Sequence, residues 1–397
     1  MTSKHQFDGH RVRISDVFDL QMGKTPSRKN PLYWRDGNHD WVSIADLGSF
    51  GKYVGKTKER INDFAVKESG IKLTPANTVL MSFKLSLGKT SITTEPVYTN
   101  EAIMAFINKG LYPVDTSFMY HQCRSKDWAA GTNAAVMGKT LNKRTLGQSV
   151  IFLPSLEEQE DIAAKLDFID EQLQKAKDVL HELDSLVKSR FVEMFGDFAC
   201  YETKPLIKCV DCIEAGKSPK CLAFSRKMAE PGVLKLSAIS SGVYCENENK
   251  ALPRSVSLTI DKVVHANDIL LSRKNTPELV GRSVLVKHTD GNIMFPDIIF
   301  RMHPLSPINA MYLSYLLAGP LLHSIQSLAH GSAKSMSNIP KSELAKLSIP
   351  IPALNLQNEF ANFASQVDKS RFGGMLHLLN SLSGIMHASF FSVADTD

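Results

Sequence analysis

Short polar and basic strings occur twice in this chain, where strands are expected to end and turns to begin. Lysine and arginine can neutralise phosphates, and arginine, lysine, asparagine and serine can read base edges in the major groove. The candidate nucleic-acid contacts of the first half are Lys24, Ser82, Lys84, Lys89, Thr132, Asn133, Lys139 and Lys143. Those of the second half are Lys217, Ser272, Arg273, Lys274, Arg282, Ser332, Lys334, Ser335 and Lys341. Taken singly, each side chain is more simply explained as capping a turn or solvating a loop, so the prediction rests on the set.

Three strings resemble the end of a phosphate-binding loop, but each lacks a glycine that the loop needs. The strings are Gly23-Lys24-Thr25, Gly88-Lys89-Thr90 and Gly216-Lys217-Ser218, and the positions five residues before their glycines hold Phe18, Phe83 and Asp211. Without that glycine the backbone cannot form a phosphate-binding nest, so we do not expect nucleotide hydrolysis.

Two further strings suggest enzymes and are also incomplete. The string Asn30-Pro31-Leu32-Tyr33 resembles an amino-methyltransferase active site, but its third residue differs and no glycine-rich cofactor loop precedes it. We expect instead that Tyr33 and Trp34 close a loop against a strand that begins at Trp41. Asp297 could begin a nuclease site, but no Glu-x-Lys follows it at short range. The chain is therefore predicted to be non-catalytic.

The cysteines could supply a metal site, since Cys209 and Cys212 have a zinc-ligand spacing and Cys221 and Cys245 follow them. At the repeat offset described below, however, the first two replace aspartates of a first half without a cysteine cluster. We expect free thiols and no metal on this chain.

A long stretch with helical periodicity lies between the two sets of polar strings. In residues 156–194 the apolar positions follow each other at alternating steps of four and three, which is typical of a helix packed lengthwise on a partner. Pro154 and Ser155 favour a helix start, and Gly196 favours a stop. Such a helix would be roughly 55 to 60 Å long. The predicted seam residues are Ile162, Leu166, Ile169, Leu173, Leu180, Leu183 and Val187.

The sequences before and after this stretch repeat each other. Gly23-Lys24-Thr25-Pro26 matches Gly216-Lys217-Ser218-Pro219 at an offset of 193, and segment 42–47 has the pattern of 234–239. An asparagine-centred turn then leads into an apolar strand that ends at Ser82 in one copy and at Ser272 in the other. We infer two bodies with the same fold.

The repeat also predicts a second long helix. Residues 153–159 align with 351–357, so the helix partner is expected in the C-terminal segment, with seam residues Phe360, Val367, Leu378 and Ile385. Gly373-Gly374 interrupts it at a cost of about 1 kcal/mol per glycine, and we expect a bend there. Because each helix follows its own body, the two helices can run antiparallel.

The predicted fold class is therefore α+β, with two pseudo-symmetric mixed α/β bodies separated by two long antiparallel helices that form a coiled coil. The expected bounds are 1–155 and 198–352 for the bodies, and 156–197 and 353–397 for the helices. The polar start and the lack of any long apolar run predict a cytoplasmic protein.

Charge is distributed unevenly along these four segments. Residues 1–155 hold 21 basic and 13 acidic residues (+8), and residues 198–352 hold 18 and 12 (+6). The helical segments are acidic, with −7 in 156–197 and −2 in 353–397. Solvated surface charge would explain this pattern, but basic bodies beside acidic helices also favour a polyanion bound by the bodies.

The string LPSLEEQEDIAAKLDFIDEQLQKAK and its weaker copy IPIPALNLQNEFANFASQVD resemble the helical regions of specificity (S) subunits of type I restriction-modification systems. The openings VRISDVFDLQMGKTPSRKNPLYW and IKCVDCIEAGKSP resemble the starts of that family's target-recognition domains. The resemblance covers essentially the whole chain and implies a non-catalytic, DNA-reading subunit. Each target-recognition domain would read half of a bipartite, asymmetric site, and the helices would set the unread gap.

The same resemblance implies the partners, which would be double-stranded DNA, two modification (methyltransferase) subunits docked on the helices, and restriction/translocase subunits. S-adenosylmethionine, ATP and Mg would then be bound by the partner subunits and not by this chain. Two alternatives stay open. One is a stand-alone DNA methyltransferase or nuclease that uses residues 30–33 or Asp297, and the other is a pseudo-symmetric scaffold that binds only protein.

Overall fold

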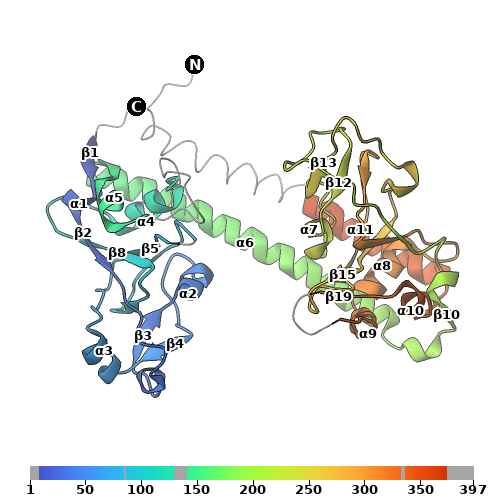
Figure 1. Cartoon of the computed structure of the whole chain (residues 1–397), viewed down its shortest axis with the longest axis horizontal. Helices are drawn as coiled ribbons and strands as arrows, with labels where there is room; N and C mark the ends of the chain where they lie inside the picture. Colours follow the sequence, from blue (N-terminus) through green and yellow to red (C-terminus); the bar gives the residue numbers. More distant parts are fainter. Residues whose placement is uncertain (1–8, 85, 129–140, 332–335, 373–397) are drawn as a thin grey trace. The chain divides into compact units, whose positions relative to one another are not determined.

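The computed structural model describes residues 9–84, 86–128, 141–331 and 336–372 (Figure 1). The chain divides into two compact units, and the division falls between Ala176 and Lys177, inside one long helix. Each unit mixes short strands with helices, so the predicted α+β class is confirmed.

Each unit is built on a four-stranded antiparallel sheet with the same strand order. In the first unit the order is β2 (Phe18–Met22), β8 (Ile103–Asn108), β5 (Val79–Ser82), β6 (Thr90–Ile92). In the second unit it is β11 (Glu214–Ala215), β18 (Ile299–Met302), β14 (Ile269–Ser272), β16 (Ser283–Leu285). The register agrees as well, because Ser82 lies opposite Ile103 and Ser272 lies opposite Ile299.

A three-stranded sheet is repeated in the same way. Its members are β4 (Glu59–Ile61), β3 (His39–Val42) and β7 (Tyr98–Thr99) in the first unit, and β13 (Asn249–Ala251), β12 (Gly232–Leu234) and β17 (Ile293–Met294) in the second. In both units the middle strand pairs antiparallel on one side and parallel on the other. The internal repeat predicted from the sequence is therefore confirmed at the level of topology.

Within the described ranges, three two-stranded ribbons complete the sheets. They are β1 (Gly9–Arg13) with β9 (Val150–Pro154), β10 (Thr203–Pro205) with β20 (Ser348–Pro350), and β15 (Lys274–Asn275) with β19 (Ser337–Asn338). In the first two ribbons, the first strand of a unit pairs antiparallel with the strand that directly precedes a long helix.

The helices are mostly short. The first unit contains α1 (Ile14–Val17), η1 (Pro31–Trp34), α2 (Ile44–Ser49), α3 (Asp63–Ser69), α4 (Thr116–Ser125) and α5 (Lys143–Gln148). The second contains η2 (Phe198–Cys200), η3 (Leu206–Lys208), α7 (Ser237–Ser240), η4 (Ile260–Lys262), α8 (Ala310–Ala318), α9 (Leu322–Ser327) and α10 (Lys341–Ala345). The long helices are α6 (Leu156–Phe195) and α11 (Leu354–Phe372). None of the described helices is both long and apolar enough to cross a bilayer.

Helix α6 confirms the helix predicted from residue 156 onward. The Ser155 hydroxyl accepts a hydrogen bond from the Glu158 amide (3.2 Å), and the helix ends one residue before Gly196. A Cβ on Gly196 would lie 2.4 Å from the Val192 carbonyl oxygen, so a glycine suits the stop.

The predicted seam of α6 is divided between two cores. Ile162 and Leu166 are buried in the core of the first unit with Phe118 of α4, and Ile169 and Leu173 are partly buried against that core. An apolar helix face packs on the apolar surface that its own body presents. The part of the C-terminal segment that would face these residues in the predicted seam lies outside the described residues.

The end of α6 does pack on α11, within the second unit. Val187 is buried there with Phe360 and Val367, and Leu183 is partly buried against the same core. The Phe360 ring lies 5.1 Å from the Phe191 ring, so the last turns of α6 meet the first turns of α11, as an antiparallel pair requires. Leu180 is half-buried. Leu378, Ile385 and Gly373-Gly374 lie outside the described residues.

A buried glutamine attaches each long helix to its unit. The Gln159 side chain accepts a hydrogen bond from the Asp115 amide (2.9 Å) and donates to the carbonyls of Pro113 (3.1 Å) and Pro154 (2.9 Å). Gln159 is fully buried. The repeat therefore predicts the same role for its counterpart in α11.

That counterpart is Gln357, which is also fully buried. It accepts from the Asn309 amide (2.8 Å) and donates to the carbonyls of Pro307 (3.3 Å) and Pro352 (2.8 Å). The repeat thus extends to individual hydrogen bonds.

The loop predicted around Tyr33 and Trp34 is also confirmed. The Trp34 ring meets the Trp41 ring edge-on at 5.0 Å, and Tyr33 packs on Phe64 at 5.5 Å. Trp41 is buried in a small core beside β3, and Tyr33 and Trp34 are partly buried against it.

Candidate nucleic-acid interface

The Gly-Lys-Thr/Ser-Pro strings are joints between the two sheets of each unit. The Gly23 amide donates to the Ile103 carbonyl (3.2 Å) and the Lys24 amide to the Thr99 carbonyl (2.8 Å). The second unit repeats both bonds from Gly216 and Lys217. A Cβ would lie 2.2 Å from the Thr99 oxygen at Gly23 and 1.9 Å from the Phe295 oxygen at Gly216, so only glycine fits.

The hydroxyl that follows each lysine is held by a carboxylate. Thr25 donates to Glu101, and Ser218 donates to Asp297, two residues before β8 and β18 begin. The Asp297 amide in turn donates to the Ser218 hydroxyl (3.2 Å). Asp297 is therefore engaged in fixing the joint, which argues against its use as a nuclease carboxylate.

Ser82 and Ser272 require a correction as candidate contacts. Both side chains are fully buried. The Ser82 hydroxyl donates to the Ser86 carbonyl, and the Ser272 hydroxyl donates to the Leu279 carbonyl at 3.0 Å. Each serine closes the turn that follows its strand, so neither hydroxyl is available to a ligand in this structure.

Lys89 and Arg282 reach the short helix beside the sheet in their respective units. Arg282 donates to the Ser240 carbonyl (3.1 Å) at the end of α7, and its buried Nε has no hydrogen-bond partner among the described atoms. A Cβ on Gly48 of α2 would lie 2.3 Å from Lys89 Nζ. Both side chains are half-buried, so their first role is to hold a helix to the sheet.

Arg273 and Lys274 lie beside the Ser218–Asp297 joint. Arg273 donates to the Asp297 carbonyl (3.4 Å), and its guanidinium lies over the Phe300 ring, 5.3 Å from the centroid. Lys274 Nζ lies 4.0 Å from the Asp297 carboxylate. Arg273 and Lys274 are half-buried, and Lys217, whose amide bonds the Phe295 carbonyl at the same joint, is exposed.

The corresponding joint of the first unit carries fewer charges. Exposed Lys24 donates to the Ser69 carbonyl, and half-buried Lys84 lies over the Phe83 ring, 5.1 Å from the centroid. The two units therefore share the backbone hydrogen bonds of the joint and differ in the charged side chains beside it.

Lys143 and Lys341 are exposed at the first positions of α5 and α10. These helices occupy matching places, each just before the strand that leads into the long helix. The remaining candidates, Thr132, Asn133, Lys139, Ser332, Lys334 and Ser335, lie outside the described residues.

Sequence reasoning missed an exposed cation on the aromatic loop of the first unit. The Arg28 guanidinium lies 3.7 Å from the centroid of the Trp34 ring and forms an ion pair with Glu59. The hydrogen bond that Arg28 donates to the Glu59 carboxylate raises the pKa of Arg28. An arginine four residues after the conspicuous Lys24, within the Thr-Pro-Ser-Arg string, was the available signal.

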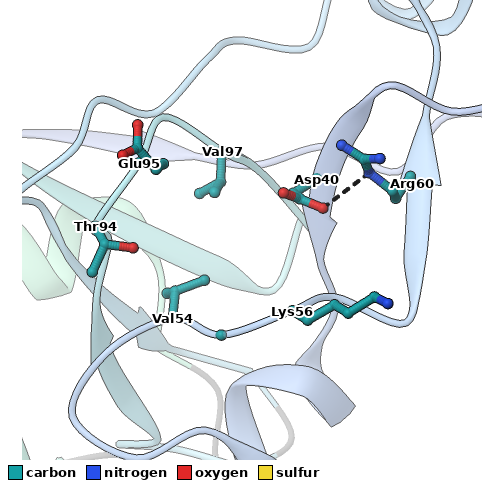
Figure 2. Close-up of a pocket in the computed structure, with 8 residues that line it drawn as sticks. Asp40, Val54, Lys56, Arg60, Thr94, Glu95 and Val97 are labelled. Atoms are coloured by element: carbon teal, nitrogen blue, oxygen red, sulfur yellow. Dashed lines mark ion pairs between the residues drawn. The ribbon is translucent and has the colours of Figure 1, made fainter.

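A shallow pocket of ≈480 Å³ lies beside the β3–β4 pair of the first unit (Figure 2). Arg60 Nε lies 3.1 Å from the Asp40 carboxylate, while Lys56 and Glu95 also line the space. Two positive and two negative side chains therefore line it. This balance does not suit a site for a polyanion.

The described residues contain no group of three or more histidine, cysteine, aspartate or glutamate side chains arranged for a metal. Burial raises the pKa of the Cys209 and Cys212 thiols. Thiols that stay protonated at neutral pH are poor zinc ligands and poor nucleophiles.

Comparison with known proteins agrees with this geometry. The family model "Type I restriction modification DNA specificity domain" matches residues 9–183. The Type I restriction enzyme MjaIX specificity subunit of Methanocaldococcus jannaschii is 27% identical over 199 residues, which are 49% of this chain and 45% of that protein. The EcoEI specificity subunit of Escherichia coli is 35% identical over 148 residues, or 36% of this chain and 25% of that protein.

These alignments thus span less than half of either curated relative. The fold extends further, because the S subunit of a type I restriction-modification system from M. genitalium aligns over 97% of this chain and 96% of its own, with a TM-score of 0.51 at 14% identity. Residues 9–183 are therefore similar to type I restriction modification DNA specificity domains, and the whole chain has the fold of a type I restriction-modification S subunit.

Proposed function

We propose that this chain is the DNA sequence-specificity subunit of a type I restriction-modification complex, and that each unit reads one half of a bipartite, asymmetric site. The observation that carries the proposal is the repeated frame with unlike side chains. The joints at Gly23 and Gly216 share their hydrogen bonds, while the first presents Lys84 and the second presents Arg273 and Lys274. Two equal frames with different cations suit two half-sites of different sequence.

The exposed lysines supply the sequence-independent part of binding. Lys24 and Lys143 in the first unit, and Lys217 and Lys341 in the second, are placed to neutralise phosphates. The net charges of +8 and +6 in segments 1–155 and 198–352 favour a polyanion in the same way. Arginine and lysine at a fixed joint would add base readout.

The remaining roles belong to partners in this proposal. Two modification subunits would dock on the long helices and carry the S-adenosylmethionine-dependent adenine methyltransferase, and restriction subunits would add ATP- and Mg-dependent translocation and cleavage. The chain itself would be non-catalytic and would act in the cytoplasm, where the DNA and these partners meet.

The deciding experiment maps methylated adenines in a host that carries this chain with its methyltransferase partner. We expect methylation at one bipartite site, and binding of the purified complex should weaken steeply with salt. An assembled complex without sequence preference would refute the proposal. Methyl transfer or cleavage by the chain alone would favour the enzyme alternative, and absence of DNA binding by the complex would favour the scaffold.

A further inference from the structure

Besides apolar packing, two kinds of polar contact that recur in both units hold the long helix. The first is the buried glutamine at the start of the helix, Gln159 or Gln357. The second is a lysine–aspartate ion pair, defined here as the brace, formed by Lys52 with Asp167 or by Lys287 with Asp368. These aspartates lie about 12 Å and about 16 Å along the helix from the glutamines. Apolar packing of Ile162 and Leu166 in the first unit, and of Phe360 and Ala364 in the second, already orients the helix. The brace adds a polar contact farther along the helix that limits its remaining swing.

In the first unit the brace is partly buried. Lys52 Nζ lies 2.5 Å from one Asp167 oxygen, and His121 Nε2 lies 2.9 Å from the other. The Lys52 side chain is 18% exposed. Its backbone carbonyl accepts a hydrogen bond from the Ile92 amide of β6 (2.8 Å), which ties the brace to the edge of the four-stranded sheet.

In the second unit the brace begins at the equivalent strand. Lys287 follows β16, which occupies the place of β6, and its Nζ contacts the Asp368 carboxylate on α11. The Asp368 side chain is only 14% exposed. Both braces thus connect the same edge strand of the sheet to the long helix.

The two lysines are not copies of each other. The repeat offset is 192 at residues 42–47 and 190 at β4 and β13, so Lys52 corresponds to a residue within 242–244, and the offset of 193 at β6 and β16 makes Lys287 correspond to Thr94; neither lysine has a lysine counterpart. Common origin of the two halves therefore does not explain why both have a brace. A requirement at this place in the fold does, since each half meets it with a different residue.

We propose that the braces set the angle at which each recognition unit is carried, and that Lys52 and Lys287 are positioning residues for the length of the gap accepted between half-sites. This inference rests on the proposed function. Its physical content is that loss of a brace lets a unit swing, so that sites with a neighbouring gap length become acceptable.

The test uses the full chain assembled with its methyltransferase partner, once the site of the wild type has been mapped. DNA substrates keep both half-sites and vary the gap by one base pair in either direction. Lys52→Met and Lys287→Met keep the aliphatic stem and remove the charge, and Lys188→Met on the exposed face of α6 is the matched control. We expect the methylation preference for the native gap to fall about fivefold in each brace variant, near the upper range for one such ion pair, and not in the control.

An exchange of charges separates positioning from general damage. Lys287→Asp combined with Asp368→Lys should restore the preference for the native gap, whereas a fold weakened at this site would not recover it. An unchanged gap preference in both methionine variants would overturn the inference.

A second measurement needs no DNA. Small-angle X-ray scattering of the full chain should show a broader distribution of pair distances in the brace variants than in Lys188→Met. Identical scattering would overturn the inference even if DNA recognition stands. A wild type without any bipartite site would instead overturn the proposed function, and the scattering would still decide whether the braces hold the units.

Discussion

At the scale of single residues, the joints show how the same residue type can serve structure in one place and binding in another. Lys24 and Lys217 follow glycines that touch the neighbouring backbone, so their amides are fixed while their side chains remain exposed. Ser82 and Ser272 have the same polar character but are buried by their turns. Exposure at a rigid joint is what separates a candidate contact from a structural residue.

The glycine of each joint should be irreplaceable. Gly216→Ala would place a Cβ 1.9 Å from the Phe295 oxygen, a backbone atom that cannot move without disturbing β17 and β18. We expect the free energy of unfolding of the second unit to fall by about 2 to 4 kcal/mol. Gly51→Ala is the matched control, since a Cβ there meets nothing within 4 Å, and urea titration of both variants measures the difference. Equal free energies of unfolding for the two variants would mean that the backbone at the joint moves to accommodate the added Cβ.

Lys217 and Arg273 should behave differently towards DNA. Lys217→Ala should weaken all sequences alike and reduce the salt slope of binding by about 1, because an exposed lysine neutralises one phosphate. Arg273→Ala should cost about 1 to 3 kcal/mol at one base position and relax specificity there. Binding titrations of the assembled complex on cognate and singly substituted sites, over a series of salt concentrations, distinguish the two. If both variants lose affinity equally for all sequences, Arg273 contacts the DNA backbone instead.

At the scale of elements, the contact between α4 and α6 carries an electrostatic network inside the first unit. The Asp167 carboxylate contacts both Lys52 Nζ and His121 Nε2, and the Asp170 carboxylate forms an ion pair with Arg124 at 2.5 Å. His121 is 3% exposed. Its burial lowers its pKa below the usual 6.5, although Asp167 acts in the opposite direction.

That shift predicts an acid-sensitive helix contact. Because the folded pKa is lower, the unfolded state binds the proton first, so stability is full above about pH 6.5 and declines as the pH falls towards the folded pKa, by up to about 1.4 kcal/mol per pH unit. Hydrogen exchange of α4 at pH 7.5 and pH 5.5 measures the loss. His121→Gln should reduce the difference between the two pH values, and His288→Gln, at an exposed site, should leave it unchanged. Equal pH dependence in all three proteins would remove His121 as the cause.

At the scale of the whole molecule, α6 is the segment shared by the two units. Its buried residues up to Leu166 belong to the core of the first unit, and those from Val187 onward belong to the core of the second. Among the residues that the structure describes, none of 174–182 is buried in either core. This middle part is the place where length can be changed without damage to a core or to a brace.

Four residues inserted between Leu173 and Leu183 should therefore alter the gap between the half-sites and leave the bases read unchanged. The insertion adds about 6 Å of helix and about 40° of rotation. Mapping of methylated adenines with the altered chain gives both the gap and the half-sites. A replacement of four residues in the same interval, with no change of length, is the control. An unchanged gap would show that α6 does not set the distance.

The amino-acid sequence by itself determined the features that depend on local pattern. The apolar period and Gly196 predicted α6 almost to the residue, and matched strings predicted two copies of one fold before any strand pairing was known. The Leu-Pro-x-Leu-Glu-Glu-Gln start and its weaker copy likewise indicated where the two long helices begin. Periodicity and helix caps depend on a few neighbouring residues, so they can be recognised in a single sequence.

Only the tertiary structure decided how individual side chains are used. Ile162 has the periodicity of a helix seam but is buried in the core of its own unit. The periodicity of an apolar face does not specify which surface the face packs on. Ser272 and Arg282 look like ligand contacts in sequence, but Ser272 bonds to a carbonyl of the turn that it closes and Arg282 to a carbonyl at the end of α7. Lys52 and Lys287 gave no repeated pattern, yet both reach the long helix from the same edge strand. These outcomes depend on contacts between distant segments, which a local pattern does not encode.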